Sequence, residues 1–218
     1  ESGDGVNPFE MGFIGSTDTH IGAGGKVKEP TWPGHIAYET DLEGRLGEAD
    51  LGRYNRLVSN PGGLAGVYAV ENSRDAIFQS MKRREAFATS GPRIEPRFFA
   101  GRYATDICGQ SNWLAQAYAN GTPMGSKLPA QSEPFQLLIQ AKADAQSNPL
   151  QKIQLIKGWI DGEGEKRYTV TDLDAERKGG ELCAVYEDAE YDPALSTYYY
   201  MRAVEEPSAR WSKAQCEA

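Results

Sequence analysis

The first part of the chain alternates short apolar runs with polar turns. Residues 11–14 form a nearly continuous apolar run that stops at the polar residues 16–20, and residues 64–70 form a second run that follows a Pro-Gly-Gly turn. Continuous apolar runs of this length are typical of strands buried on both faces. We therefore predict two buried strands, and polar side chains at the end of the first.

Residues 74–85 carry the pattern of an amphipathic helix. Asn72 or Ser73 can cap its first turn, and basic side chains lie in its last turn, where they suit the negative end of the helix dipole. Strands are expected on either side of the turn that follows, at residues 86–89 and 94–100. The predicted apolar face of the helix consists of Ile77, Phe78 and Met81.

The second part of the chain has the pattern of an all-β region. In residues 135–143, apolar side chains fall at every second position and polar ones lie between them, which predicts a half-buried strand. Regular Gly, Pro and Asn-containing turns separate further strands. These further predicted strands are residues 152–160, 167–171, 182–186 and 197–204.

These patterns predict an α/β + β fold class with two parts. Residues 1–106 form the mixed α/β part and residues 107–218 the β-rich part, with the change of character between residues 104 and 130. Short strands at regular spacing favour a small all-β, sandwich-like module for the second part.

Composition narrows the possible partners of the chain. Its 218 residues are 39% hydrophobic and 25% charged, as in an ordinary globular protein, and its formal net charge is −8. An acidic surface repels phosphate backbones, so we expect no nucleic-acid partner. The longest apolar run is far shorter than the ~18 residues of a membrane span. The chain starts without Met or a leader pattern, which predicts the edge of a mature form or of a fragment.

The chain contains three cysteines, Cys108, Cys183 and Cys216. Their spacing is too wide for a CxxC metal knuckle. An odd number allows one disulfide and one free thiol, or three free thiols, and free cysteines are often simply buried apolar residues. The sequence leaves these alternatives open.

Asp18 and His20 are the sharpest pair of chemistry-bearing residues. Residues two apart in extended backbone point the same way, so a carboxylate and an imidazole here can reach one metal ion; the alternative is a hydrogen-bonded loop pair. Catalytic zinc usually has three protein ligands, and the chain has only two histidines. Further carboxylates are nearby, but their spacing selects none of them: Glu39, Asp41 and Glu43.

Two other places are weaker candidates. His35 can face the same cleft as His20, although a surface-loop histidine is the simpler interpretation. Thr89, Ser90 and Arg93 lie at a tight turn after a predicted strand, where Arg93 and Ser90 can contact an anionic substrate. The alternative for this turn is a purely structural role.

The segment around Asp18 and His20 resembles the last metal-binding segment of the PHP (polymerase and histidinol phosphatase) superfamily. The matching stretch is residues 7–20, and ordered segments over nearly the whole chain resemble an uncharacterised PHP-like family classed as a domain of unknown function. These segments include Asn60-Pro61-Gly62-Gly63-Leu64, Glu71-Asn72-Ser73-Arg74, Ala88-Thr89-Ser90-Gly91-Pro92-Arg93-Ile94, Pro123-Met124-Gly125, Ile156-Lys157-Gly158-Trp159 and Tyr198-Tyr199-Tyr200-Met201-Arg202.

The resemblance implies a metal-dependent hydrolase, by analogy a phosphoesterase, in which divalent zinc, manganese or iron ions activate water. It assigns Asp18 and His20 as metal ligands and implies a small, phosphorylated substrate and a periplasmic or secreted location. PHP proteins begin with a His-x-His segment that this chain lacks. We therefore expect residues 1–106 to be the C-terminal portion of a PHP-like barrel, the remaining ligands to lie upstream, and the chain alone to be inactive.

A rival interpretation makes the chain a non-catalytic, β-rich binding or structural module, in which Asp18 and His20 are incidental. Attachment to carbohydrate or to a cell surface through the β-rich part is a third possibility, which rests on fold analogy alone. A His-x-His segment upstream of this chain would favour the enzyme. The sequence does not determine the oligomeric state.

Overall fold

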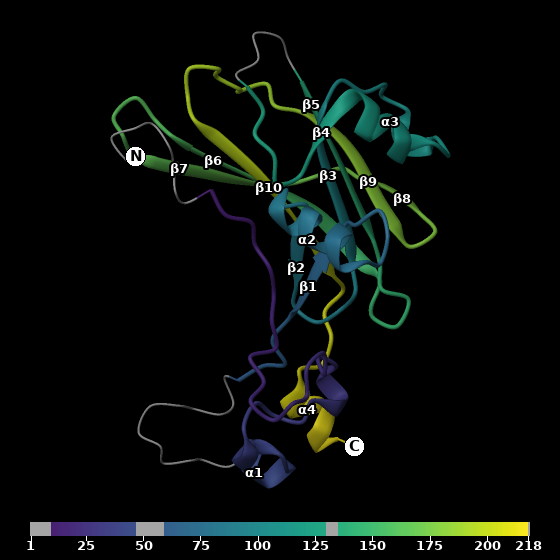
Figure 1. Cartoon of the computed structure of the whole chain (residues 1–218), viewed down its shortest axis with the longest axis vertical. Helices are drawn as coiled ribbons and strands as arrows, with labels where there is room; N and C mark the ends of the chain where they lie inside the picture. The colour runs from purple at the N-terminus through teal and green to yellow at the C-terminus, as the bar shows by residue number, and fades with distance from the viewer. Residues whose placement is uncertain (1–9, 47–58, 130–134, 218) are drawn as a thin grey trace. The chain divides into compact units, whose positions relative to one another are not determined.

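The computed structural model describes residues 10–46, 59–129 and 135–217 (Figure 1). The chain divides into two compact units: Glu1–Arg93 with Pro207–Ala218, called unit 1, and Ile94–Glu206, called unit 2. The strands of the described residues form three antiparallel sheets, so the fold is mixed and rich in strand. None of these sheets closes into a barrel within the described residues. No helix among them is long and apolar enough to cross a membrane.

Unit 1 contains a two-stranded sheet and several short helices. Strand β1 (Leu64–Val67) pairs antiparallel with β2 (Ala86–Thr89), and α2 (Arg74–Lys82) lies between them in the chain. Trp211 of the C-terminal helix is fully buried, and its indole N–H donates to Ser59 O at 2.7 Å. The other short helices are η1 (Glu29–Thr31), η2 (Ala37–Glu39), α1 (Leu42–Leu46) and α4 (Trp211–Cys216).

The prediction of a buried strand at residues 11–14 is wrong. The stretch has no regular secondary structure, and the side chains of Met11, Phe13 and Ile14 are 68%, 83% and 58% exposed. The chain here runs against the backbone of the β1–β2 sheet, because Gly63 N donates to Ser16 O at 2.8 Å. Backbone contact of this kind holds the segment in place, and no described element covers its apolar side chains.

The second predicted buried strand is only partly confirmed. β1 ends at Val67, and its side chains are half-buried or exposed because the sheet has two strands. Val70, at the end of the predicted run, is 94% exposed.

Helix α2 is confirmed, but its predicted buried face is wrong. Ser73 caps it by accepting a hydrogen bond from Ala76 N, and the helix ends at Lys82. Phe78 and Met81 are more than half exposed, whereas Ser80 is completely buried. The Ser80 hydroxyl donates to Tyr68 O at 2.6 Å, so the helix docks through a small polar residue.

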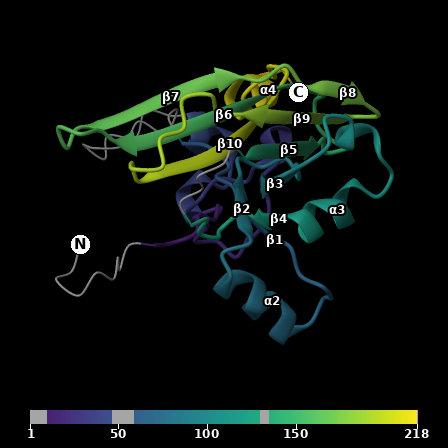
Figure 2. The same cartoon turned by 90° about the horizontal axis from the view of Figure 1, so that it is seen from above.

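Unit 2 consists of two antiparallel sheets that share one hydrophobic core, and Figure 2 shows the strands of both sheets from above. One sheet has the strand order β10-β6-β7 and the other β4-β3-β5-β9-β8. The prediction of a β-rich module with strands in these regions is confirmed. The strands are β3 (Glu95–Gly101), β4 (Gly121–Pro123), β5 (Gln136–Lys142), β6 (Leu150–Ile160), β7 (Lys166–Asp172), β8 (Glu176–Lys178), β9 (Glu181–Glu187) and β10 (Thr197–Glu205).

The main core of unit 2 lies between its two sheets. Leu137, Ile139 and Ala141 of β5 are completely buried against Ile153 and Leu155 of β6. The period-two pattern of residues 135–143 therefore identified the inward face of β5 correctly.

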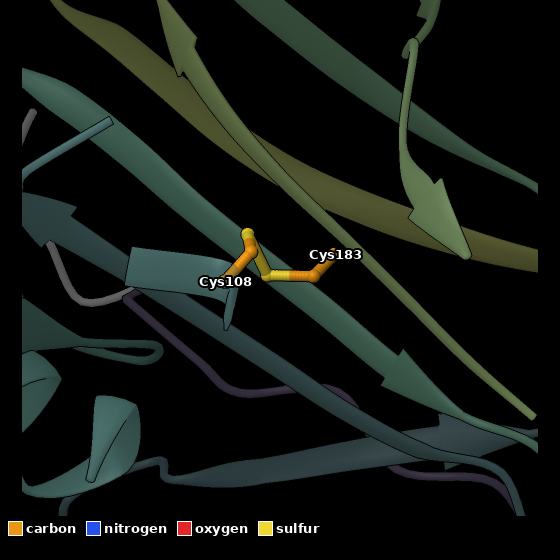
Figure 3. Close-up of a disulfide and its surroundings, with 2 residues drawn as sticks. All are labelled: Cys108 and Cys183. Carbon is orange, nitrogen blue, oxygen red and sulfur yellow. A yellow bond between two sulfur atoms is a disulfide. The ribbon is translucent and has the colours of Figure 1, made fainter. Parts of the chain in front are cut away.

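The predicted half-burial of this strand is wrong, because the other face of β5 is covered and not solvated. Leu138 is completely buried and Gln140 is 6% exposed, because η4 (Ile107–Gly109) and α3 (Trp113–Asn120) build a second core over this face. Cys108 of η4 and Cys183 of β9 form a disulfide beside this second core (Figure 3). Cys216 is free and exposed.

Candidate functional site

Asp18 and His20 lie close together on the surface of unit 1. His20 Nε2 is 3.6 Å from Asp18 Oδ1, and the two side chains are 65% and 88% exposed, respectively. The predicted convergence of the two side chains is therefore seen, although no strand precedes it. Asp18 has a φ of 51°, so the backbone turns here and simple strand alternation is not what brings the pair together.

A neighbouring loop fixes the backbone at His20. His20 N donates to His35 O at 2.8 Å. On the other side, Gly62 has a φ of 75° and packs closely on Thr17: a Cβ at Gly62 would lie 2.8 Å from Thr17 Cα. Glycine is favoured at Gly62 both by this left-handed conformation and by the close approach. The segment that carries the pair is thus attached to the chain on both sides.

The distance between the two side chains fits a shared metal ion. Two ligand atoms about 2.0–2.1 Å from one tetrahedral zinc stand about 3.3 Å apart, close to the 3.6 Å between His20 Nε2 and Asp18 Oδ1. A carboxylate and an imidazole are also suitable donors for zinc, manganese or iron. Within residues 10–46, 59–129 and 135–217, however, no three His, Cys, Asp or Glu side chains form a group that could hold a metal. The pair is at most part of a ligand set.

The nearby carboxylates have structural contacts of their own. Glu39 is 5% exposed, and its Oε2 accepts from His35 N at 2.8 Å. Asp41 accepts from Gly44 N at the first turn of α1, and Glu43 lies within that helix. In the described part of the chain, no hydrogen bond or ion pair joins these three carboxylates to His20.

His35 is not the surface-loop histidine that the simpler interpretation predicts. Its ring packs edge-on against Trp32, with 5.0 Å between ring centroids, and its Nδ1 is buried without a hydrogen-bond partner among the described residues. A preceding Gly34 with a φ of 85° turns the loop inward over Glu39.

The turn after β2 places Thr89, Ser90 and Arg93 in unit 1. Thr89 Oγ1 accepts from Gly91 N at 3.2 Å, so this hydroxyl shapes the turn, while Ser90 and Arg93 are exposed. Gly91 has a φ of 135° and lies against Val27 O. The backbone of Thr89 is close to Gly15, because a Cβ at Gly15 would lie 2.9 Å from Thr89 O.

Unit 2 contains a buried ionic cluster that the sequence patterns above do not predict. Lys157 Nζ lies 2.6 Å from Asp188 Oδ2, and the two side chains are 11% and 5% exposed. Tyr199 Oη donates to the same oxygen at 2.5 Å, and Lys157 Nζ also donates to Glu190 O at 2.9 Å. A signal was present: Lys157 occupies an inward position of β6, in line with Ile153 and Leu155.

These contacts shift the pKa values of Asp188 and Tyr199. Burial alone would raise the pKa of Asp188, but the hydrogen bonds from Lys157 and Tyr199 outweigh it and hold that pKa below its ordinary value. Burial, reinforced by the hydrogen bond to Asp188, raises the pKa of Tyr199 far above 10. At neutral pH Asp188 is therefore a carboxylate and Tyr199 a neutral phenol.

The family to which the chain belongs is shown by a match to a family model. The model described as "Protein of unknown function (DUF3604)" matches residues 1–180 and 174–218. The chain belongs to the DUF3604 family. No curated protein and no solved structure matches it. Membership of DUF3604 agrees with the resemblance to a domain of unknown function. By itself it indicates no reaction, substrate or metal.

Proposed function

We propose that this DUF3604 chain supplies two ligands, Asp18 and His20, to the divalent-metal site of a hydrolase. The observation that carries the proposal is their 3.6 Å separation in a backbone that is attached on both sides. Zinc, manganese and iron are the expected metals, and phosphate esters the expected substrate class.

The exposure of the pair supports a role in binding. A contact between two solvated side chains contributes only about 0–1 kcal/mol to stability even where both are charged, so folding gains little from this arrangement. With side chains 65% and 88% exposed, both the imidazole and the carboxylate remain open to a shared ion and to further ligands around it. Those further ligands belong to residues outside the described part of the chain.

The apolar side chains beside the pair support a larger domain. Met11, Phe13 and Ile14 lie a few residues before Asp18 and are all more than half exposed. Contiguous exposed apolar surface usually marks an interface. We assign this surface to the remainder of a PHP-like α/β barrel, which would cover it and bring the missing ligands to Asp18 and His20.

Substrate contacts are proposed for the turn after β2. Ser90 and Arg93 are exposed there, and a guanidinium with a hydroxyl suits a phosphate oxygen. The Cys108–Cys183 disulfide supports a periplasmic or secreted location, because disulfides persist in oxidising compartments.

The proposal is tested in the natural protein that contains this chain. We expect His20→Ala to lower bound metal and to reduce hydrolysis of p-nitrophenyl phosphate or bis-p-nitrophenyl phosphate by at least about 100-fold, since a direct ligand should matter more than the 10–100-fold of an outer-shell residue. Asp174→Asn changes an exposed carboxylate and is the control. Full metal content and full activity in His20→Ala would refute the proposal.

A non-catalytic binding role for unit 2 is the second candidate function. It is favoured by the buried cluster of Lys157, Asp188 and Tyr199, which lies in a different unit from Asp18 and His20. The two functions can coexist in one protein.

A further inference from the structure

The cluster of Lys157, Asp188 and Tyr199 forms one wall of an open groove in unit 2. The groove has a volume of about 280 Å³. Its lining comes from the inward faces of β6, β7 and β10 and from the end of β9 with the loop that follows. The lining residues are Leu155, Lys157, Thr169, Thr171, Tyr186, Asp188, Ala189, Glu190 and Tyr199.

The strand register arranges this lining in rows. Tyr199 of β10 pairs with Lys157 of β6, and Lys157 pairs with Thr169 of β7, so three polar side chains stand side by side across the sheet. In the next row, Leu155 pairs with Thr171. The groove therefore has an ordered polar floor built on three neighbouring strands.

The floor offers hydroxyl groups that the protein leaves unused. The hydroxyls of Thr169, Thr171 and Tyr186 make no hydrogen bond to any residue in the described part of the chain. Each can both donate and accept. By contrast, Asp188 already accepts from Lys157, Tyr199 and Glu190 N, which fixes the wall rigidly.

The charges of the lining disfavour an anionic ligand. Lys157 is neutralised by Asp188, and Glu190, an exposed lining residue whose charge acts on Tyr186, leaves the lining with one net negative charge. Lys157 also lies 5.3 Å from the centre of the Trp159 ring, so its ammonium is enclosed by protein groups. A phosphate or carboxylate would meet Glu190 without a free cation to balance it.

We propose that this groove binds a neutral polyhydroxylated ligand, a single sugar ring or the sugar end of a glycan. Hydroxyls that both donate and accept match the hydroxyls of a sugar, and the rings of Tyr186 and Tyr199 offer apolar surface to its C–H groups. The volume lies just below the roughly 300 Å³ of the smallest ligand pockets, which suits one ring rather than an oligosaccharide. The proposal is independent of metal binding by Asp18 and His20.

The test is a titration of the ¹⁵N-labelled 218-residue chain, followed by amide NMR, with methyl glycosides of glucose, mannose, galactose and N-acetylglucosamine up to 50 mM. We expect at least one of them to shift the amides of Thr169, Thr171, Ala189 and Glu190 saturably. The expected Kd is about 1–10 mM, as for a small ligand in an open site. Glucosamine and glucose 6-phosphate are the charged comparisons.

Variants separate specific binding from general surface effects. Thr169→Val, Thr171→Val and Tyr186→Phe each remove one hydroxyl, and each should raise the Kd about threefold to tenfold. Tyr168→Phe is the matched control, because Tyr168 points to the opposite face of β7 and is 72% exposed. Its Kd should equal that of the unmodified chain.

Three results would overturn the proposal. The first is that no neutral glycoside moves the groove amides at 50 mM. The second is that only glucosamine or glucose 6-phosphate does so, and the third is that Thr169→Val and Thr171→Val leave the Kd unchanged. Each outcome leaves metal binding by His20 untouched.

Discussion

The disulfide between Cys108 and Cys183 should provide a large part of the stability of unit 2. It closes a loop with a sequence separation of 75 residues, and it joins η4 to the central region of the sheet at β9. In the chain-entropy description, a closed loop of this length destabilises the unfolded state by about 4.5 kcal/mol. Because measured disulfides often deliver less, we expect reduction to lower the free energy of unfolding by about 3–4.5 kcal/mol.

The assay is amide hydrogen exchange of β5 and β9, followed by mass spectrometry, which reports the opening of unit 2 specifically. Three samples are compared with the oxidised chain: the chain in a reducing agent, the double variant Cys108→Ala with Cys183→Ala, and Cys216→Ala. The double variant should lose about 1 kcal/mol more than the reduced chain, because Cys183 is buried and its sulfur also packs in the core.

Cys216 is free and exposed, so Cys216→Ala should change stability by less than about 0.5 kcal/mol. If reduction leaves the exchange of β5 and β9 unchanged, the disulfide does not stabilise unit 2 and the reasoning fails.

Three further predictions follow from buried polar groups. The hydrogen bonds to Asp188 lower its pKa in the folded state. Asp188 therefore stabilises the fold above its unfolded pKa of about 3.9, and this stability is lost as the pH falls. Asp188→Asn should flatten this acid dependence in urea unfolding measured from pH 6 to 2. Burial raises the pKa of Tyr103 to about 12. The stability that the neutral phenol contributes is therefore complete below pH 10 and is lost as the pH rises toward 12. Tyr103→Phe should remove one late phenolate step from the absorbance titration at 295 nm and reduce the loss of stability at alkaline pH. Ser80→Ala removes the hydroxyl that donates to Tyr68 O and should destabilise unit 1 by about 1–2 kcal/mol in urea unfolding. Ser90→Ala changes an exposed serine and should leave the stability unchanged. Equal effects of the two substitutions would contradict the docking role of Ser80.

Local patterns predicted the elements of this fold better than their burial. The alternation in residues 135–143 identified both β5 and its inward face, and the capping signal at Ser73 located the start of α2. These features depend on neighbours within a few residues. Burial depends on what packs over an element, and this is why Phe78 and Met81 are exposed although they share one helix face.

Long-range contacts account for the remaining errors. The second face of β5 is covered by η4 and α3, whose position depends on a fold around Cys108 and Cys183 that no spacing rule specifies. Residues 11–14 have the composition of a buried strand, yet no described element covers them.

The candidate site shows the same division. Asp18 and His20 could be singled out from their spacing, and the structure places them 3.6 Å apart. The cluster around Lys157 was missed because its partners, Asp188 and Tyr199, come from different strands or loops. A lysine at an inward position of an otherwise apolar strand is the signal that could have located it.

The most direct test of the central claim is the response of the two histidine side chains to metal. Zn²⁺ is titrated into the ¹⁵N-histidine-labelled natural protein that contains this chain, and the imidazole nitrogens of His20 and His35 are followed by NMR. We predict that Zn²⁺ changes the chemical shifts of the His20 imidazole nitrogens but not those of His35, which packs on Trp32. Asp18→Asn should weaken the Zn²⁺ affinity reported by His20 at least about tenfold, equivalent to about 1.4 kcal/mol. Asp174→Asn should leave this affinity unchanged. A His20 imidazole that ignores Zn²⁺, or that responds equally in Asp18→Asn, would contradict the assignment of this pair as metal ligands.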